Sequence, residues 1–312
     1  MAMKKIGKIG VLMGGPSSER EISLKSGKAV FQSLQSAGID VVAIDIKTED
    51  VAENLRLLKA SRIDCAFLAL HGWFGEDGQI QAILEELKMP YTGSGPQASR
   101  TAMDKTASRE VFLKADLTIP RCKILEKSKG RVKDFNLEQF GLPLVVKPAS
   151  QGSSVGLSII DQHGQFSTAL DLAFQYDEKV LIEEYIPGRE LTVGILHEQA
   201  LPLIEIMPKN RFFDFQAKYQ SGMSEYIVPA QLPKAIAELV QAKAMLAHKI
   251  LGCRDFSRVD IILRQDNTPF VLEVNTIPGF TETSLLPKAA RASGIDFVEL
   301  CVKLIELAYE KA

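Results

Sequence analysis

The hydrophobic positions in the first third of the chain alternate between short apolar runs and longer stretches with helical periodicity. The apolar runs typical of buried strands are 9–13, 41–46 and 65–70. The stretches with helical periodicity are 17–38, 51–60 and 78–88. This β-α-β-α-β-α order predicts a parallel sheet with helices on its faces. Ligands of such sheets bind beyond the carboxyl ends of the strands, so the loops there are the first places to look for chemistry.

The pattern changes after the turn-rich stretch Tyr91–Pro96. A helical region, three strands and a further helix follow, which predict a small α+β unit: 99–113, 121–125, 142–146, 155–160 and 166–174. Strands then dominate, with one long helix at 234–251: 180–185, 190–196, 202–206, 259–263 and 270–274. We therefore predict three domains, an N-terminal α/β domain and two α+β domains: 1–96, 97–182 and 183–312.

Composition and charge narrow the class of protein. A net charge of −2 without a long basic block argues against nucleic acid or an anionic membrane as a partner. No apolar run approaches the length that crosses a bilayer, and the N-terminus lacks a signal-peptide pattern. The four cysteines are scattered, which is typical of reduced thiols. These features predict a cytoplasmic protein.

The loop "KPASQGSSVG", Lys147–Gly156, follows the buried strand 142–146. It does not match the Walker pattern, because its lysine precedes the glycines. Gly152 and Gly156 give conformational freedom, and Ser153 and Ser154 add donors, so the loop could close over phosphates beside Lys147. The alternative is a surface hairpin with a solvated lysine, which the apolar run before it makes the weaker interpretation.

The stretch Arg258–Asn275 carries the strongest pattern. Two strand patterns flank Asp266-Asn267, which reads as a two-residue hairpin turn. In that register Asp260 opposes Glu273 and Arg258 opposes Asn275, all on one face. Carboxylates so paired lie roughly 5 Å apart and repel each other. A Mg²⁺ ion between them would remove the repulsion. The alternative is a solvent-facing polar side neutralised by Arg258.

Two N-terminal loops are ambiguous from their residues alone. Ser18-x-x-Glu21 fits a helix capping box, which explains the acids around Glu19 without a ligand; the alternative is that Glu19 attracts an ammonium group. His71 follows the third strand and is equally well read as a structural hydrogen-bonding group or as a neighbour of Glu19.

Two C-terminal stretches extend the candidate site. The long connection 211–226 is rich in aromatic and polar residues, which suits a lid over a site. In 276–287, Gly279 allows a close backbone approach, and Ser284 could open a helix whose amides accept a carboxylate.

Together these motifs resemble the D-alanine–D-alanine ligases of the ATP-grasp superfamily. The resemblance runs in one order along essentially the whole chain. It rests on GGPSSEREISLKSG, ALHGWFGEDGQIQ, YTGSG, MDK, VVKPASQGSSVG, LIEEYIPGRELTV, AKY, SRVD and LEVNTIPGFTETSLLP. It implies a three-domain ATP-grasp fold in which two α+β domains enclose ATP.

The resemblance also implies a role for each matching residue. Nucleotide contacts are implied for Lys105, Lys147, Ser153, Glu183, Glu184, Ile186, Glu190 and Lys218. Two Mg²⁺ ions, with Mn²⁺ as an alternative, are implied at Asp260, Glu273 and Asn275. D-alanine contacts are implied for Glu19, His71, Lys218, Ser284 and Leu285. Catalytic contributions are implied for Glu19, Ser153, Tyr219, Arg258 and Gly279. The loop 151–156 would close over the γ-phosphate.

The implied activity is ATP-dependent joining of two D-alanine molecules through a D-alanyl phosphate, which supplies the dipeptide for peptidoglycan. A homodimer is implied as well. The resemblance also implies that Tyr219, in the A-K-Y motif, favours an amine over D-lactate as second substrate. Two alternatives stay open: a ligase for another second substrate such as D-lactate, and a nucleotide sensor without turnover. The sensor has no need for Glu19, Arg258 and both acids together.

Overall fold

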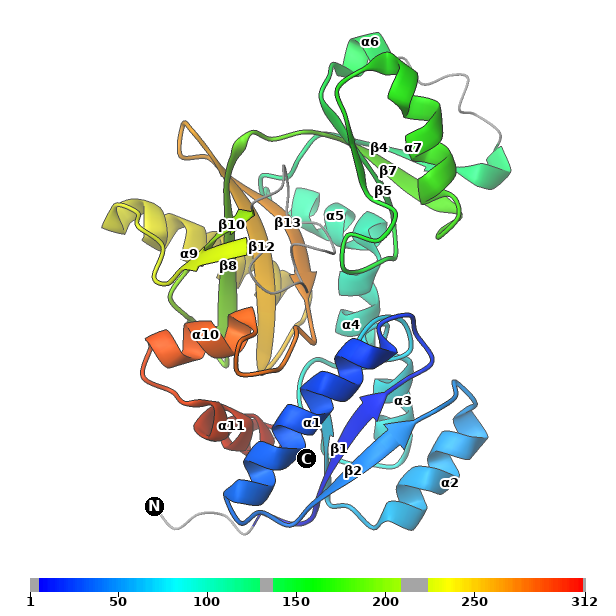
Figure 1. Ribbon diagram of the computed structural model, residues 1–312, viewed down its shortest axis with the longest axis vertical. Helices are drawn as coiled ribbons and strands as arrows, with labels where there is room; N and C mark the ends of the chain where they lie inside the picture. The colour runs from blue at the N-terminus through cyan, green and yellow to red at the C-terminus, as the bar shows by residue number, and fades with distance from the viewer. Residues whose placement is uncertain (1–5, 130–136, 209–223, 311–312) are drawn as a thin grey trace.

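Three β-sheets organise the chain, and the computed structural model describes residues 6–129, 137–208 and 224–310 of it. Figure 1 shows the N-terminal sheet at one end of the molecule and the four-stranded sheet at the other. The largest sheet lies between them.

The N-terminal sheet is parallel, as the alternating pattern predicts. Its strand order is β2-β1-β3. The strands are β1 (Ile9–Gly14), β2 (Val41–Ile46) and β3 (Cys65–Leu68). The intervening helices are α1 (Arg20–Ser36), α2 (Val51–Ser61) and α3 (Gln79–Glu86). Successive residues of β1 point to opposite faces, so Val11 packs in the cluster with α1 while Leu12 packs in the cluster with α2 and α3.

The four-stranded sheet is antiparallel, with the order β4-β7-β5-β6. Its strands are β4 (Cys122–Glu126), β5 (Leu144–Pro148), β6 (Ser158–Ile160) and β7 (Lys179–Glu184). The helices around it are η1 (Lys127–Lys129), α6 (Leu137–Phe140), η3 (His163–Gln165) and α7 (Phe166–Ala173). Leu170 of α7 packs with Val146 and Ile182 of the strands, so α7 covers one face and leaves the other for a ligand.

The six-stranded sheet has the order β11-β10-β8-β12-β13, and β9 pairs with β8. Its strands are β8 (Gly188–Leu196), β9 (Gln199–Ala200), β10 (Ile204–Pro208), β11 (Ser224–Ile227), β12 (Phe256–Arg264) and β13 (Pro269–Asn275). The C-terminal half contributes helices α9 (Lys234–Ile250), α10 (Leu285–Ala292) and α11 (Phe297–Tyr309). Val240 of α9 packs with Val259 of β12, and Leu286 of α10 packs with Leu196 of β8.

The apolar clusters join segments that are far apart in the chain. Helix α11 packs on α1 and the N-terminal sheet, where Leu304 shares a cluster with Val11. Helices α4 (Pro96–Met103) and α5 (Lys105–Lys114) contribute Ala102 and Phe112 to the cluster under the largest sheet. Residues on both sides of positions 96 and 182 therefore share cores, and the three-domain division at those positions stays a prediction.

Two local expectations are wrong. Helix α1 has Glu19, not Ser18, at its N-cap, and no side chain caps it, so the expected capping box does not form. The β12–β13 turn has a three-residue loop instead of two, because Arg264 N–H donates to Thr268 O at 3.0 Å. Asn267 takes the left-handed conformation there, with φ 63°. This conformation is tolerated by asparagine, and it suits a loop one residue longer than the sequence pattern suggested.

Across the described ranges, none of the helices combines the length and apolarity that traversing a bilayer requires. All four cysteines lie within these ranges, and no disulfide joins any two of them.

One buried histidine makes stability depend on pH. His248 of α9 is 3% exposed, and its Nδ1 lies 2.7 Å from Ser257 Oγ on β12. Burial lowers the pKa of His248 to about 4, and the neighbouring Lys249 acts in the same direction. The unfolded chain therefore takes up a proton as pH falls below about 6.5, while the folded chain does not.

We predict that wild type loses stability relative to His248→Gln as pH falls from 7.5 to 5, by about 2 kcal/mol at pH 5. The contribution of neutral His248 is complete above pH 6.5 and declines as pH drops toward 4. Thermal unfolding of both proteins at a series of pH values measures it. Parallel Tm curves for the two proteins would contradict the prediction.

Candidate active site

Two adjoining cavities collect the residues that the sequence singled out. The larger, about 700 Å³, lies between the N-terminal sheet and the largest sheet. The smaller, about 160 Å³, lies between the four-stranded and the largest sheets. Lys105 and Glu273 line both. Every expected site residue within the described ranges lines one of them: Glu19, His71, Lys105, Lys147, Ser153, Glu183, Glu184, Ile186, Glu190, Arg258, Asp260, Glu273, Asn275, Gly279, Ser284 and Leu285.

The two acids of the hairpin lie opposite each other as predicted. Asp260 pairs with Glu273, and Arg258 pairs with Asn275. A β-bulge directly after Asp260 shifts the register by one residue toward the turn. The three-residue turn introduces the opposite shift, and the two cancel at the site. The prediction of the pairing was therefore correct although its turn was wrong.

Cations surround the acid pair. Arg258 donates from Nε to Asp260 Oδ1 at 2.9 Å and from Nη2 to Oδ2 at 2.7 Å. Thr192 Oγ1 on β8 donates to Asp260 Oδ1 at 2.7 Å. Lys105 Nζ lies 3.3 Å from Glu273 Oε2. Each carboxylate thus has a cationic partner, which offsets the repulsion between the two.

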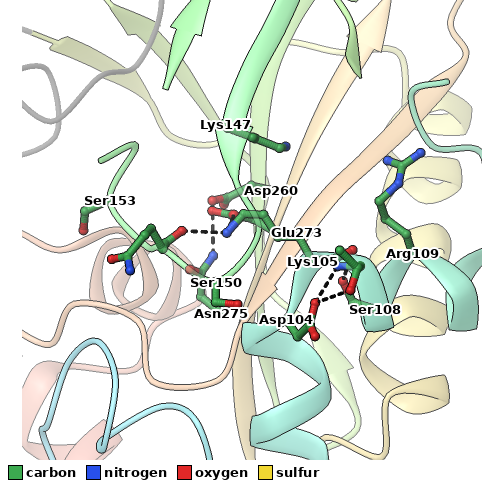
Figure 2. Close-up of polar contacts among 12 residues, drawn as sticks. Asp104, Lys105, Ser108, Arg109, Lys147, Ser150, Ser153, Asp260, Glu273 and Asn275 are labelled. Carbon is green, nitrogen blue, oxygen red and sulfur yellow. Dashed lines mark hydrogen bonds and ion pairs between the residues drawn. The ribbon is translucent and has the colours of Figure 1, made fainter. Parts of the chain in front are cut away.

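Asn275 completes the oxygen-rich face. Its amide N–H donates to Asp260 Oδ2 at 3.2 Å, a contact drawn in Figure 2. Within the described residues, no three His, Cys, Asp or Glu side chains gather into one metal-binding group. The acid pair with one amide is instead a small, hard oxygen set. Such a set suits Mg²⁺, which completes its shell with water and substrate oxygens.

Lys105 reaches the acids because of where α5 begins. Asp104 caps this helix by accepting hydrogen bonds from Thr106 N–H at 2.8 Å and Ala107 N–H at 3.3 Å. The cap places Lys105 at the first helical position, with its Nζ donating to Gln151 O at 2.7 Å. Lys105 therefore joins the acid pair to the glycine-serine loop.

Lys147 lies in a buried ion cluster. Its Nζ is 2.6 Å from Glu183 Oε2, and Arg109 Nη1 donates to Glu183 Oε1 at 2.9 Å. All three residues are less than 10% exposed. Lys147 on β5 and Glu183 on β7 are diagonal neighbours on one face of an antiparallel pair. Arg109 escaped the sequence analysis, although its spacing of four from Lys105 places both on one face of α5.

The loop after Lys147 contacts the N-terminal sheet. Ser153 Oγ donates to Glu19 Oε1. Ser153 and Ser154 both adopt left-handed conformations, with φ 54° and 58°. Of the two glycines expected to supply this freedom, Gly156 is left-handed and Gly152 is not. The loop thus carries backbone strain at its serines, and strain of this kind concentrates at functional sites.

His71 is buried between the N-terminal and largest sheets, with 4% exposure. Its Nε2 lies 2.9 Å from Ser26 Oγ, and its Nδ1 lies 3.1 Å from Ile277 O. Gly72 beside it has φ 73°, and a Cβ there would come within 2.9 Å of Glu19 Oε2. His71 and Glu19 are therefore neighbours in one wall of the larger cavity, which their sequence positions left undecided.

The helix α10 begins at the larger cavity, as expected. Ser284 occupies its N-cap position but makes no cap with its side chain. Its Oγ instead accepts from Thr281 N–H at 3.0 Å. A Cβ at Gly279 would lie 3.3 Å from the same hydroxyl, so the loop before α10 is tightly folded.

The residues expected to line a nucleotide base lie in the smaller cavity. Glu184 accepts from Arg121 N–H at 2.8 Å, which fixes the end of β7. Ile186 is buried, and Glu190 lies on β8 opposite Ile262. Lys218 and Tyr219, and most of the expected lid 211–226, lie outside the described residues; the described part, Ser224–Tyr226, forms strand β11 with Ile227.

The comparisons with known proteins agree over the full chain. Family models described as the D-ala D-ala ligase N-terminus and C-terminus match residues 8–94, in two overlapping segments, and 112–306. A D-alanine–D-alanine ligase of Geotalea uraniireducens is 47% identical over 304 residues, covering 97% of this chain and 96% of the relative. That of Trichlorobacter lovleyi is 48% identical, covering 94% and 92%.

Solved structures give the same result. A D-alanine–D-alanine ligase of Bacillus anthracis complexed with ATP is similar with a TM-score of 0.85 and 34% identity, covering 98% of both chains. The VanG D-Ala:D-Ser ligase of Enterococcus faecalis is similar with a TM-score of 0.82 and 29% identity, covering 97% of this chain and all of the other. On this sequence and structural evidence, the chain belongs to the D-alanine–D-alanine ligase family.

Proposed function

We propose that this protein joins two D-alanine molecules to D-alanyl-D-alanine at the expense of ATP, with ADP and phosphate as products. The observation that carries the proposal is the convergence of all the described site residues on two cavities that share Lys105 and Glu273. We further propose a cytoplasmic homodimer that supplies the dipeptide for peptidoglycan.

ATP would occupy the smaller cavity with its phosphates directed toward the larger one. The Bacillus anthracis relative was solved as a complex with ATP, and its fold matches this chain over nearly its whole length. The smaller cavity offers an apolar wall with Ile186 and Leu272, and Lys147 and Lys105 at its charged side. Two lysines beside a glycine-serine loop suit a polyphosphate chain, which needs point charges and backbone donors.

Asp260, Glu273 and Asn275 would hold Mg²⁺. The acids face each other across β12 and β13, and the amide of Asn275 lies on the same face. When bound, Mg²⁺ would neutralise charge that develops on the phosphate oxygens during phosphoryl transfer. Mn²⁺ accepts the same oxygen ligands.

The first step is attack by the carboxylate of one D-alanine on the γ-phosphorus of ATP. The bond to ADP breaks as the acyl phosphate forms, and Lys105 and Lys147 stabilise charge on the phosphoryl oxygens. Glu19 would hold the ammonium group of this D-alanine. The Glu19–Ser153 contact supports this assignment, because it brings the acid to the loop that would cover the phosphates.

The second step is attack by the amine of another D-alanine on the acyl carbon, followed by loss of phosphate. The tetrahedral intermediate carries an oxyanion, for which Arg258 and the Gly279 amide are donors in the wall of the larger cavity. The first turn of α10, at Ser284 and Leu285, would accept the carboxylate of the second substrate.

A second candidate differs only in the second substrate. The VanG relative is a D-Ala:D-Ser ligase with the same fold, so the fold itself accommodates D-serine. D-lactate is the other alternative that the sequence left open. With D-lactate, a hydroxyl in place of an amine would attack the same activated carbonyl, and the product would be an ester.

The function is tested by incubating the purified chain with ATP, Mg²⁺ and D-alanine alone. We expect ADP, phosphate and D-alanyl-D-alanine in equal amounts, quantified by mass spectrometry. L-alanine should give no product, and mixtures with D-serine or D-lactate should still give mainly D-alanyl-D-alanine. ADP formation that does not depend on any D-amino acid would reject the proposal.

For the metal site, we predict that Asp260→Asn and Glu273→Gln each lower Mn²⁺ affinity in the presence of ADP by at least about 100-fold, because each removes a charged ligand. D-alanine-dependent phosphate release should fall at least as far. Mn²⁺ binding is followed by electron paramagnetic resonance. Asp266→Asn is the matched control, an exposed acid at the turn of the same hairpin. Wild-type Mn²⁺ affinity in both site variants would remove these acids from the metal site.

For the nucleotide site, we predict that Lys147→Ala raises KM for ATP about 10- to 100-fold, since a charge-assisted contact contributes about 1.5–3 kcal/mol. KM for D-alanine should change much less. Glu183 keeps Arg109 as its partner, so the fold should hold. Lys123→Ala, which removes an exposed lysine from the same sheet, serves as control. An equal rise of KM in both variants would contradict the assignment.

A further inference from the structure

The loop 277–280 is clamped to the N-terminal sheet at two points by one polar circuit. Phe280 N–H donates to Ser26 Oγ at 3.2 Å. Ser26 Oγ lies 2.9 Å from His71 Nε2, and His71 Nδ1 lies 3.1 Å from Ile277 O. The circuit therefore begins and ends in the same loop and passes through α1 and the loop after β3. Gly279 lies between the two clamped positions.

A neutral His71 ring admits a single arrangement of protons in this circuit. Ile277 O is only an acceptor, so His71 Nδ1 must carry the proton. In that ring Nε2 has no hydrogen and can only accept, so the Ser26 hydroxyl donates to it while its oxygen accepts from Phe280 N–H. One hydroxyl thus favours the Nδ1–H tautomer of His71 over the Nε2–H tautomer and holds the Phe280 backbone amide.

Burial makes this circuit costly to break. Ser26 is 1% exposed and His71 is 4% exposed. Removing the hydroxyl leaves the Phe280 N–H and His71 Nε2 without that partner away from water. The Phe280 ring is held separately by Phe67, Phe256 and Phe297, at centroid distances of 5.4, 5.9 and 5.7 Å. Loss of the clamp would therefore free the backbone of the loop while its aromatic anchor stays in place.

Ser26 also lies between two parts of the larger cavity wall, the part with Glu19 and the part with Gly279. It lies seven residues after Glu19, about two helical turns, and so on the same face of α1. Glu19, Ser26, His71 and Gly279 all line that cavity. The Ser26 hydroxyl therefore lies between the wall proposed for the first substrate and the loop whose amide is proposed for the oxyanion.

We propose that Ser26 is a positioning residue that holds the Gly279 amide and the His71 tautomer in the arrangement that ligation needs. The proposal deepens the ligase function proposed above and rests on it. Ser26 acts through Phe280 and His71, not through the reacting atoms.

The first test measures the tautomer and needs no activity. The chain has four histidines, so ring ¹⁵N labelling and long-range ¹H–¹⁵N spectra resolve them, with His71→Gln for assignment. Wild type should show Nδ1 protonated and Nε2 unprotonated at pH 8. Ser26→Ala should shift the His71 signals toward the other tautomer or a mixture, and Ser26→Thr, which keeps a hydroxyl, should lie nearer to wild type.

The second test separates positioning from folding. Ser26→Ala should lower kcat for dipeptide formation about 10- to 100-fold, with KM for ATP within about 2-fold of wild type, because small displacements of oriented groups carry rate penalties of this size. Ser23→Ala is the matched control. Ser23 is equally buried on α1, but its hydroxyl bonds Gly14 N–H and Ala69 O, within the N-terminal sheet region.

The outcomes are distinct. If Ser23→Ala and Ser26→Ala lower Tm alike and leave both kcat and the His71 tautomer unchanged, Ser26 is only structural and the proposal is overturned. Ser26→Thr falling below Ser26→Ala on both readouts would overturn it too. If wild type makes no dipeptide while the tautomer result holds, the proposed ligase function fails and the clamp alone remains.

Discussion

Repulsion between the carboxylates of Asp260 and Glu273 requires cationic side chains close to both of them. The two acids lie directly opposite on β12 and β13, in a half-buried cleft where like charges are poorly screened. Arg258 donates two hydrogen bonds to Asp260, and Lys105, at the start of α5, forms an ion pair with Glu273. One electrostatic requirement thus explains the positions of Arg258 and Lys105. It also explains why Asp104 caps α5 at the residue before Lys105.

The same logic governs exchange of partners on ligand binding. In the proposed reaction, Asp260 and Glu273 would hold Mg²⁺, and Lys105 and Lys147 would turn to the phosphates, so these four side chains exchange an internal partner for a ligand. A buried charge left alone would be expensive. Glu183 avoids this because Arg109 stays with it when Lys147 turns to phosphate. The charges of the site are therefore balanced by internal ion pairs before a ligand binds, and these pairs can open when the ligand supplies the opposite charge.

The sequence predicted the parallel N-terminal sheet and the residues that gather around the two cavities, because both rest on local periodicity and family motifs. Period-two alternation predicted that Asp260, Glu273, Arg258 and Asn275 lie on one face. The predicted pairing is correct only because the register shift of the bulge and that of the longer turn cancel. Local rules failed where tertiary contacts compete. Ser18 does not cap α1, since Glu19 occupies the N-cap position and its carboxylate accepts from Ser153 instead.

Contacts between distant segments were beyond the reach of the sequence. His71 and Ile277 are 206 positions apart, and nothing in either segment signals that a ring nitrogen meets that carbonyl. The reason they meet lies in the core: the Phe280 ring packs among aromatic side chains from β3, β12 and α11. The loop 277–280 is thus anchored in the apolar cluster that holds the N-terminal sheet to α11. Packing in that cluster positions the loop as a whole, and the contacts of Ser26 and His71 then fix its backbone against the N-terminal side of the larger cavity.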